Sequence, residues 1–366
     1  MRPQYEVASV LQALGIGVEQ LGLNDYQLRI LRAIKNCRTA ELGGHVDACT
    51  SCGLVQYSYN SCRNRHCPKC QGHKKHEWIQ NRINELLPVP YFHVVFTLPQ
   101  TINSLALHKP SVVYNSLFSA AWDTIKIFGL KKKIAVGMVT VLHTWGQNLS
   151  LHPHLHCIIP GAGINANGKL QTTTQKGKYL FPVKAMSKMY RAKYVACLRK
   201  AGITDQVLIA KLFTQEWVVY AKRPFGTPAS VIEYLGRYTH KVAISNNRIQ
   251  DVTDEAVTFG YKDYKSDAAK KVMTLKHGEF IRRFAQHIMP RGFMRIRHYG
   301  ILSSTSKRTT LKVLLPSLQL PKKERQVNTM LKKCPCCKTA TMVTIEIIPK
   351  RGPPKTLVYR QKKCAT

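Results

Sequence analysis

The chain has 366 residues and a formal net charge of +37, because 56 Lys and Arg stand against 19 Asp and Glu. Such a basic excess favours a polyanionic partner. Nucleic acid is the first expectation, since cationic side chains neutralise phosphates and release counterions. Apolar stretches such as Ile134 to Leu142 are far shorter than the ~20 residues of a membrane-spanning helix, and residues 1–6 open no apolar signal-peptide core. We therefore expect no membrane partner, and a cytosolic chain of two or three units at ~100–200 residues per domain.

The N-terminal part of the chain carries a predicted metal site. Two Cys-x-x-Cys pairs, Cys49/Cys52 and Cys67/Cys70, have 14 residues between them, a spacing typical of a tetrahedral zinc ribbon. Because the cytosol keeps thiols reduced, the twelve cysteines favour metal ligation over disulfides. We predict one structural Zn²⁺ held by these four thiolates, which leave no open position for chemistry.

The rest of this N-terminal unit, residues 1–88, contains a predicted helix and a basic surface. Apolar residues recur at helical spacing over residues 21–36, and Pro88-Val89-Pro90 makes a natural boundary. Four further side chains are expected to pack or hydrogen-bond, with a second zinc site as the alternative: Cys37, His45, Cys62 and His66. We expect the basic side chains of this unit to dock DNA, with a solvated face as the alternative: Arg63, Arg65, Lys74 and Lys75.

A second unit, residues 89–302, mixes predicted strands and helices. Its first segment, residues 91–98, is rich in aromatic and β-branched side chains and ends at Pro99, as expected of a buried strand. Further along the chain we predict a helix over residues 101–129, strands over 135–145 and 152–159, a helix over 185–202 and a strand over 216–222.

The strand over residues 152–159 carries the first candidate catalytic residues. Alternate residues of a strand share a face, so His154 and His156 point the same way while Leu155 points into the opposite layer. Two neutral imidazoles suit a divalent ion, and a third polar ligand would complete the set while leaving positions for a phosphate. The alternative is that both histidines are only hydrogen-bonded. We predict Gln147 as the third ligand, with two further candidates: His143 and His152.

Two tyrosines in a predicted helix are the second set of candidates. Thr227 followed by Pro228 fits a helix N-cap with proline in the first helical position. Tyr234 and Tyr238 then lie one turn apart, with Cβ atoms about 5–6 Å from each other. A pair of half-buried core aromatics is the alternative, but nearby cations suit a surface that meets phosphate: Arg237, His240 and Lys241.

The chain beyond this helix is basic. Residues 256–264 alternate as expected of a strand. Residues 303–366 are punctuated by proline, and we expect a basic tail that is partly disordered. Its Cys334-Pro335-Cys336-Cys337 is similar to half of a zinc knuckle, with free thiols as the alternative. Five arginines are expected to line a DNA channel, with a solvated surface as the alternative: Arg282, Arg283, Arg291, Arg295 and Arg297.

These motifs, in this order, closely resemble those of a known family. Thr144-Trp145-Gly146-Gln147-Asn148 leads into His152-Pro153-His154-Leu155-His156-Cys157, and Tyr234-Leu235-Gly236-Arg237-Tyr238 follows. Phe96-Thr97-Leu98-Pro99 and Cys62-Arg63-Asn64-Arg65-His66-Cys67-Pro68-Lys69-Cys70 fit the same pattern. Over about residues 20–300 the chain resembles the two-tyrosine rolling-circle transposases of the HUH endonuclease superfamily, the insertion-sequence ninety-one type, with their N-terminal zinc-binding domain.

The resemblance implies an α+β fold, in which a zinc-ribbon-like domain precedes a nuclease domain with a central antiparallel sheet flanked by helices. His154 and His156 would bind a catalytic Mg²⁺ or Mn²⁺ from a central strand, and Tyr234 and Tyr238 would be nucleophiles on a helix beneath it. One tyrosine would attack single-stranded DNA at an element end or target, leaving a 5′-phosphotyrosine and a free 3′-hydroxyl. Lys241 and the neighbouring Arg237 would favour the phenolate, since a phenol has an ordinary pKa of ~10.

The resemblance therefore implies a transposase of a prokaryotic insertion sequence, working in the cytoplasm at the nucleoid. Two alternatives remain open. A rolling-circle replication initiator or relaxase would share the histidines and tyrosines, and a zinc-dependent DNA-binding regulator would form no covalent adduct with DNA.

Overall fold

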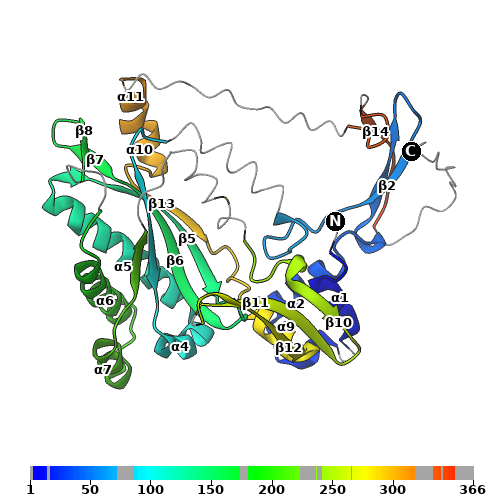
Figure 1. Ribbon diagram of the computed structural model, residues 1–366, viewed down its shortest axis with the longest axis horizontal. Coiled ribbons are helices and arrows are strands. Elements are labelled where there is room, and N and C mark those ends of the chain that lie inside the picture. The colour runs from blue at the N-terminus through cyan, green and yellow to red at the C-terminus, as the bar shows by residue number, and fades with distance from the viewer. Residues whose placement is uncertain are drawn as a thin grey trace. The chain divides into compact units, whose positions relative to one another are not determined.

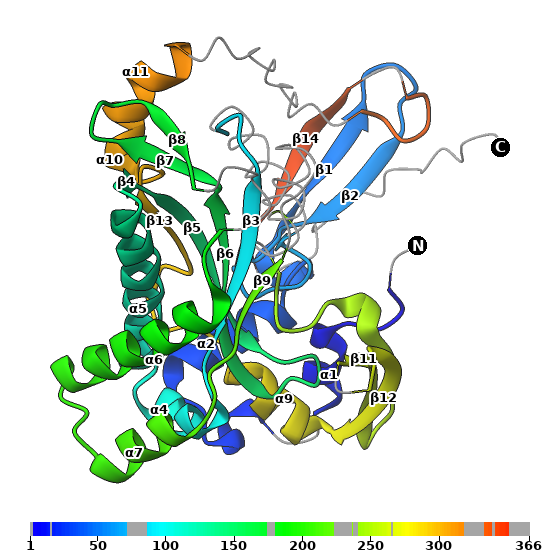
Figure 2. The ribbon, with the colours of Figure 1, turned by 60° about the vertical axis from the view of Figure 1, so that its left-hand side comes forward.

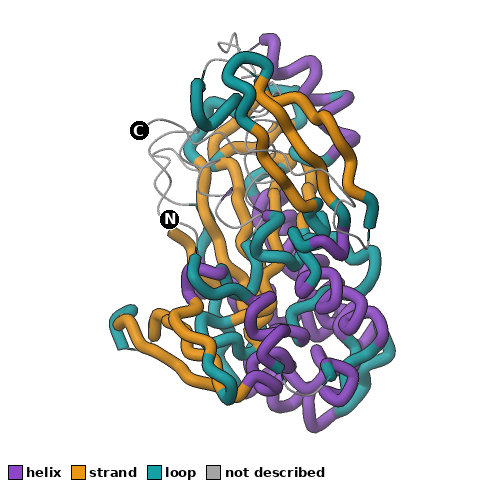
Figure 3. Tube along the Cα trace, turned by 90° about the vertical axis from the view of Figure 1, so that its right-hand side faces the viewer, coloured by secondary structure: helices purple, strands orange, loops and turns teal. Residues whose placement is uncertain are grey.

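The computed structural model describes residues 3–14, 17–71, 86–173, 180–222, 236, 241–264, 266–317, 333–338 and 341–350. The chain divides into two compact units. The first combines Met1–His73, Ile244–Ala285 and Glu324–Thr366, and the second combines Lys74–Ala243 and Gln286–Lys323. Both contain helices and antiparallel sheets (Figure 3), which confirms the predicted α+β class. Among the described helices, none is long and apolar enough to cross a membrane.

One sheet of the first unit joins the two ends of the chain. Strands β1 (Gly44–Cys49) and β2 (Val55–Tyr59) form a hairpin, and β14 (Met342–Ile348) pairs antiparallel with β1 on the other side (Figure 1). The sequence predicts a basic tail after residue 303, and the structure differs because β14 is a run of β-branched residues that completes this sheet.

The remainder of the first unit packs helices on a second sheet. Helix α2 (Asp25–Lys35) confirms the helix predicted over residues 21–36, but it begins later because Asn24 is its N-cap. The other elements are α1 (Val7–Ala13), η1 (Val18–Leu21), η2 (Ala40–Leu42), η4 (Asn246–Arg248), β10 (Ile249–Val252), β11 (Ala256–Asp263), β12 (Ala269–Lys276) and α9 (His277–Ala285). Strands β10, β11 and β12 form an antiparallel meander, and β11 confirms the strand predicted over residues 256–264.

The second unit is built on a five-stranded antiparallel sheet. Its strand order is β13-β5-β6-β3-β9, with β6 in the centre (Figure 2). The strands are β3 (Tyr91–Thr97), β5 (Gly137–Trp145), β6 (Leu151–Pro160), β9 (Val219–Lys222) and β13 (Ile296–Gly300). The first four confirm the strands predicted in this part of the chain, and β6 is the predicted histidine strand.

The two faces of this sheet are covered differently. Alternate residues such as Phe96 and Leu155 pack with Phe118 and Tyr190 into one apolar core, on the face covered by α5 (Pro110–Lys131) and α6 (Val183–Lys200). The opposite face carries a smaller apolar cluster that includes Val141 and Ile158. The remaining elements of the unit are η3 (Gln100–Ile102), α4 (Asn103–His108), β4 (Ile134–Ala135), β7 (Ala162–Asn165), β8 (Leu170–Thr172), α7 (Gln206–Thr214), α10 (Ser304–Arg308) and α11 (Thr310–Ser317).

Candidate functional site

A cluster of three histidines lies on the second unit's central strands. His154 and His156 come from β6, and His143 comes from β5, where it is the direct register partner of His154. One ring nitrogen of each lies within 4.8 Å of the other two. Leu155 belongs to the apolar core on the helix-covered face, so the two β6 histidines share the opposite face as predicted.

Neighbouring side chains hold these rings in place. His93 on β3 places Nε2 2.9 Å from Nδ1 of His156, and their rings are stacked. Trp145 stacks on His143 with ring centroids 4.5 Å apart. His154 places its own Nδ1 2.7 Å from the carbonyl oxygen of His152. The hydrogen bonds occupy Nδ1 of both β6 histidines, which leaves their Nε2 atoms as the metal-facing candidates.

The surroundings keep these imidazoles neutral. Burial lowers the pKa of His154 to about 4, and the nearby positive charge of Lys241 adds to the effect. Burial also holds the pKa of His156 well below its ordinary value, with further contributions from His143 and Lys241. A neutral imidazole has a free lone pair, so the cluster is prepared for metal ligation at neutral pH.

The three imidazoles fit a divalent metal ion. This donor set suits borderline ions better than Mg²⁺, which prefers oxygen ligands. The third predicted ligand, Gln147, lies in the turn after β5, whereas His143 lies within the cluster. The sequence offers His143 as an alternative for that position, and the ligand role of Gln147 stays a prediction.

Lys241 lies close enough to the histidines for its charge to act on both β6 imidazoles. Its backbone carbonyl accepts a 3.0 Å hydrogen bond from Nη1 of Arg295. Arg295 is only 9% exposed and supports the chain next to Lys241, and its predicted place in a DNA channel stays a prediction. Tyr234, Tyr238 and Arg237 lie outside the described residues.

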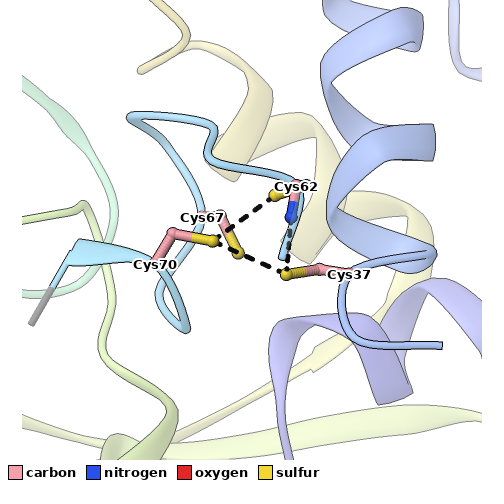
Figure 4. Close-up of side chains that lie close together, drawn as sticks. All are labelled: Cys37, Cys62, Cys67 and Cys70. Atoms are coloured by element: carbon pink, nitrogen blue, oxygen red, sulfur yellow. Dashed lines mark hydrogen bonds between the residues drawn. The ribbon is translucent and has the colours of Figure 1, made fainter. Parts of the chain in front are cut away.

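A cluster of four cysteines lies in the first unit. Cys37, Cys62, Cys67 and Cys70 each offer one sulfur atom, and all four sulfurs lie within 4.8 Å of one another (Figure 4). The sulfur of Cys70 lies 3.6 Å from those of Cys37 and Cys62, close to the spacing of about 3.8 Å that Zn–S bonds of ~2.3 Å impose in a tetrahedron. The backbone N–H of Cys62 also donates to the sulfur of Cys37. Four thiolates fit a structural Zn²⁺ without an open position.

The predicted grouping of the cysteines is wrong. Cys67 and Cys70 are joined by Cys37 and Cys62, for which packing was the first expectation, and not by Cys49 and Cys52. Instead, Cys49 and Cys52 lie with two cysteines from the other end of the chain, Cys334 and Cys337. Sequence spacing misled here because Cys49 and Cys52 lie at the tip of the β1–β2 hairpin, while Cys67 and Cys70 lie in the later loop.

His45 and His66 do not join the described metal clusters. His45 pairs with Asp47, with Nε2 and Oδ2 3.4 Å apart, and His66 is buried beside Asn64.

The other predicted DNA-binding residues have mixed surroundings. Arg63 is exposed, and Arg65 is half-buried. Arg282 and Arg283 on α9 both bond to Glu279, and Arg282 is the main cause of a Glu279 pKa lowered to about 2. The guanidinium of Arg297 lies 4.0 Å from the centre of the Phe118 ring. Lys74 and Lys75 lie outside the described residues.

Comparison with known proteins identifies family models and proteins that are similar to this chain. Residues 137–309 match a family model described as "Putative transposase", and residues 13–98 match one described as "Transposase zinc-binding domain". The chain is 40% identical over 388 aligned positions to the "Putative transposase y4qJ" of Sinorhizobium fredii (strain NBRC 101917 / NGR234), an alignment that covers 96% of this chain and 97% of that protein. It is 26% identical over 317 positions to the "Transposase for insertion sequence element IS801" of Pseudomonas savastanoi pv. phaseolicola, covering 83% of this chain and 77% of that protein. No solved structure shows significant similarity.

The matches define a class, the DNA transposases with an N-terminal zinc-binding domain. Within this class, the chain belongs to the insertion-sequence ninety-one type, as its motifs predict. Its partner is therefore DNA, and the cysteine cluster within residues 13–98 fits the zinc ion of its zinc-binding domain.

Proposed function

We propose that this transposase nicks single-stranded DNA at the ends of its element and transfers the strand through 5′-phosphotyrosine intermediates. The observation that carries the proposal is the cluster of His143, His154 and His156 on a central strand pair, with Lys241 at electrostatic range. Lys241 lies three residues after Tyr238 in the sequence, and Tyr238 lies four residues after Tyr234. The nearness of Lys241 to the histidine cluster in space, and to the tyrosines in sequence, supports a single site for the metal ion and the nucleophiles.

A bound Mg²⁺ or Mn²⁺ would polarise the scissile phosphate and neutralise the charge that develops on its oxygens. His143, His154 and His156 would hold such an ion. Their chemistry favours Mn²⁺ over Mg²⁺. When His156 carries its proton on Nδ1, it donates a hydrogen bond to Nε2 of His93, and the lone pair of its own Nε2 would face the ion.

Tyr234 or Tyr238 supplies the nucleophile. The phenolic oxygen forms a bond to phosphorus while the bond to the 3′-oxygen breaks, so the strand carries a 5′-phosphotyrosine and a free 3′-hydroxyl. The phenol loses its proton as it attacks, and the departing 3′-oxygen gains one. The positive charge of Lys241 favours the phenolate. Strand joining reverses the step, and the phosphotyrosine bond conserves the energy needed for it.

Two tyrosines suit two coupled cuts. The first tyrosine holds one strand end while the second cuts at the other end or in the target. A single nucleophile would have to release the first strand before a second cut.

The zinc-binding unit supports DNA docking by its charge and aromatic side chains. A groove of about 1020 Å³ is lined by exposed Arg38, Arg63 and Lys350, together with exposed Tyr57 and Tyr59. Glu6 is the acid of this described lining, and it forms an ion pair with Lys69. Cations beside aromatic rings suit single-stranded DNA, because its phosphates contact the cations and its bases stack on the rings. Action on the element's DNA also favours the cytoplasm, at the nucleoid, as the place of work.

Cleavage of labelled oligonucleotides from the element's ends tests the function. We expect site-specific cleavage of single strands with Mn²⁺ or Mg²⁺, and products with free 3′-hydroxyls. His154→Ala with His156→Ala abolishes cleavage and leaves DNA binding in a gel-shift assay largely intact. The matched control is His108→Ala on α4, which keeps full cleavage. Binding without cleavage by the wild type would favour a regulator and overturn the proposal.

A further inference from the structure

The second cysteine cluster joins segments at opposite ends of the chain. Cys49 and Cys52 end the first strand of the β1–β2 hairpin, and Cys334 and Cys337 precede β14. All four sulfur atoms lie within 4.8 Å of one another. Residues 13–98, which match the zinc-binding family model, contain only the first pair.

The two halves of this cluster are built alike. In the first, the N–H of Gly53 donates to the carbonyl of Cys49 at 3.2 Å, and Gly53 has a φ of +69°. In the second, the N–H of Lys338 donates to the carbonyl of Cys334 at 3.0 Å, and Lys338 has a φ of +59°. Each Cys-x-x-Cys turn is therefore closed by a left-handed residue directly after its second cysteine. Lys338 takes this conformation although it is unfavourable for a residue with a Cβ atom.

Backbone N–H groups also point at the sulfurs in both halves. The N–H groups of Ser51 and Cys52 lie 3.4 Å from the sulfur of Cys49. The N–H of Cys336 lies 3.4 Å from the sulfur of Cys334. Such donors stabilise thiolates and orient them for a metal, as outer hydrogen bonds do around metal ligands in general.

The distances between sulfurs select a metal over disulfides. Cys49 and Cys337 lie 3.7 Å apart, and Cys52 and Cys334 lie 3.6 Å apart. A disulfide requires about 2.05 Å, whereas a tetrahedral zinc with Zn–S bonds of ~2.3 Å places sulfurs about 3.8 Å apart. Cys49 and Cys334 are almost fully buried, at 4% and 1% exposure.

β14 pairs with β1 along its length, but the apolar cluster beneath this sheet is small. The apolar cluster around these sulfurs contains Met342 and Leu54 beside the cysteines. On β14, Ile347 is 77% exposed, and Val343 and Ile345 are each 48% exposed. A metal ion is a common substitute for a large apolar core in such a small module.

We propose that Cys49, Cys52, Cys334 and Cys337 bind a second structural Zn²⁺, which fastens the C-terminal strand β14 to the N-terminal zinc-binding unit. The zinc ribbon of this protein is thus assembled from two half-sites that are 282 residues apart at Cys52 and Cys334. Four sulfur ligands select a soft or borderline ion such as Zn²⁺. The site is independent of the nicking chemistry proposed above.

Metal content per chain tests this site directly. We expect two Zn²⁺ per chain in the purified full-length protein by elemental mass spectrometry with amino-acid analysis. Cys334→Ser with Cys337→Ser reduces the content to one. The matched control, Cys62→Ser with Cys67→Ser, removes the other ion and also leaves one.

Three further readouts keep the test valid if a variant folds poorly. Co²⁺ exchanged into the wild type should give thiolate-to-metal absorption for two four-cysteine sites, and a thiol reagent should leave Cys334 and Cys337 unmodified until the metal is removed. Limited proteolysis should release the segment around Met342–Ile348 from the Cys334→Ser, Cys337→Ser protein and not from the wild type. One Zn²⁺ in the wild type, with Cys334 and Cys337 open to the reagent, would overturn the proposal.

Discussion

At the scale of single residues, the cluster of histidines was predictable only in part. Alternation along one strand places His154 and His156 on one face without knowledge of any partner strand. His143 needs the register of β5 with β6, and His93 needs the register of β3 with β6. Register is a tertiary property, so the sequence offers His143 only as one candidate among three and gives no signal for His93.

Replacing the proposed third ligand should weaken metal binding. His143→Phe keeps an aromatic ring against Trp145 but removes both donor nitrogens. We expect the affinity for Mn²⁺ to fall by about 10- to 100-fold or more, measured by calorimetry or by the paramagnetic signal of free Mn²⁺. Gln147→Ala is the matched comparison, because the sequence predicts Gln147 as the third ligand, and it should lose less affinity than His143→Phe. A large loss in Gln147→Ala beside an unchanged His143→Phe would restore the glutamine as the ligand.

A buried histidine behind the cluster predicts a pH dependence of stability. His287 is 3% exposed, donates from Nε2 to the carbonyl of Leu149 and accepts at Nδ1 from the hydroxyl of Thr144. Burial lowers its pKa to about 4. Between an unfolded pKa of ~6.5 and this folded value, the unfolded chain binds more protons, so the free energy of unfolding falls as the pH falls. The contribution is complete above pH ~6.5 and is at most about 3.5 kcal/mol, at ~1.4 kcal/mol per tenfold change in proton affinity.

Urea unfolding of the wild type and His287→Gln checks this effect. At pH ~7 the wild type should be the more stable, and its advantage should shrink towards pH ~4 because glutamine does not titrate. The other buried histidines affect both proteins alike. Parallel stability curves across this range would exclude the role of His287.

At the scale of elements, local pattern was sufficient for strands and helices but not for their partners. The strand β11 and the helix α2 follow from alternation and from helical spacing. β14 is equally readable as a β-branched run, yet its pairing with β1 crosses almost the whole chain. The cysteines show the same limit, because a Cys-x-x-Cys spacing cannot say which other cysteines complete its cluster.

Arg295 directly precedes β13 and donates a hydrogen bond to the backbone carbonyl of the proposed catalytic residue Lys241. Arg295→Met removes a charged donor to the Lys241 carbonyl, and such a hydrogen bond contributes about 1.5–3 kcal/mol. We expect slower oligonucleotide cleavage with nearly unchanged DNA affinity, since the side chain is buried. Arg291→Met on the preceding loop is exposed and removes the same charge. If Arg291→Met slows cleavage as much as Arg295→Met, the loss of charge and not the hydrogen bond is responsible.

At the scale of the whole molecule, the charge of +37 predicts salt-sensitive binding to DNA. About six phosphate contacts to a single strand give a slope of roughly −4 in log affinity against log salt. Replacing Arg63 and Lys350 in the groove by methionine should make this slope shallower by about 1.4, measured by fluorescence anisotropy. The paired control, Lys132→Met with Lys200→Met, lies in the other unit and should leave the slope unchanged. Equal effects of both pairs would mean that binding is spread over the surface and not concentrated in the groove.

The order of motifs along the chain predicts the family more securely than any single motif. The matches to the transposase and zinc-binding family models confirm that prediction. The chemistry assigned to Tyr234 and Tyr238 rests on the histidine cluster and on Lys241 beside it.

The covalent protein–DNA adduct tests that chemistry most directly. Wild-type protein is incubated with a 5′- or 3′-labelled single strand from an element end and Mn²⁺, denatured, and digested for mass spectrometry. The account predicts a denaturation-resistant adduct linked through the 5′-phosphate to Tyr234 or Tyr238, and none in Tyr234→Phe with Tyr238→Phe. An adduct that persists in this double variant, or a wild type that cleaves DNA without forming one, would contradict it.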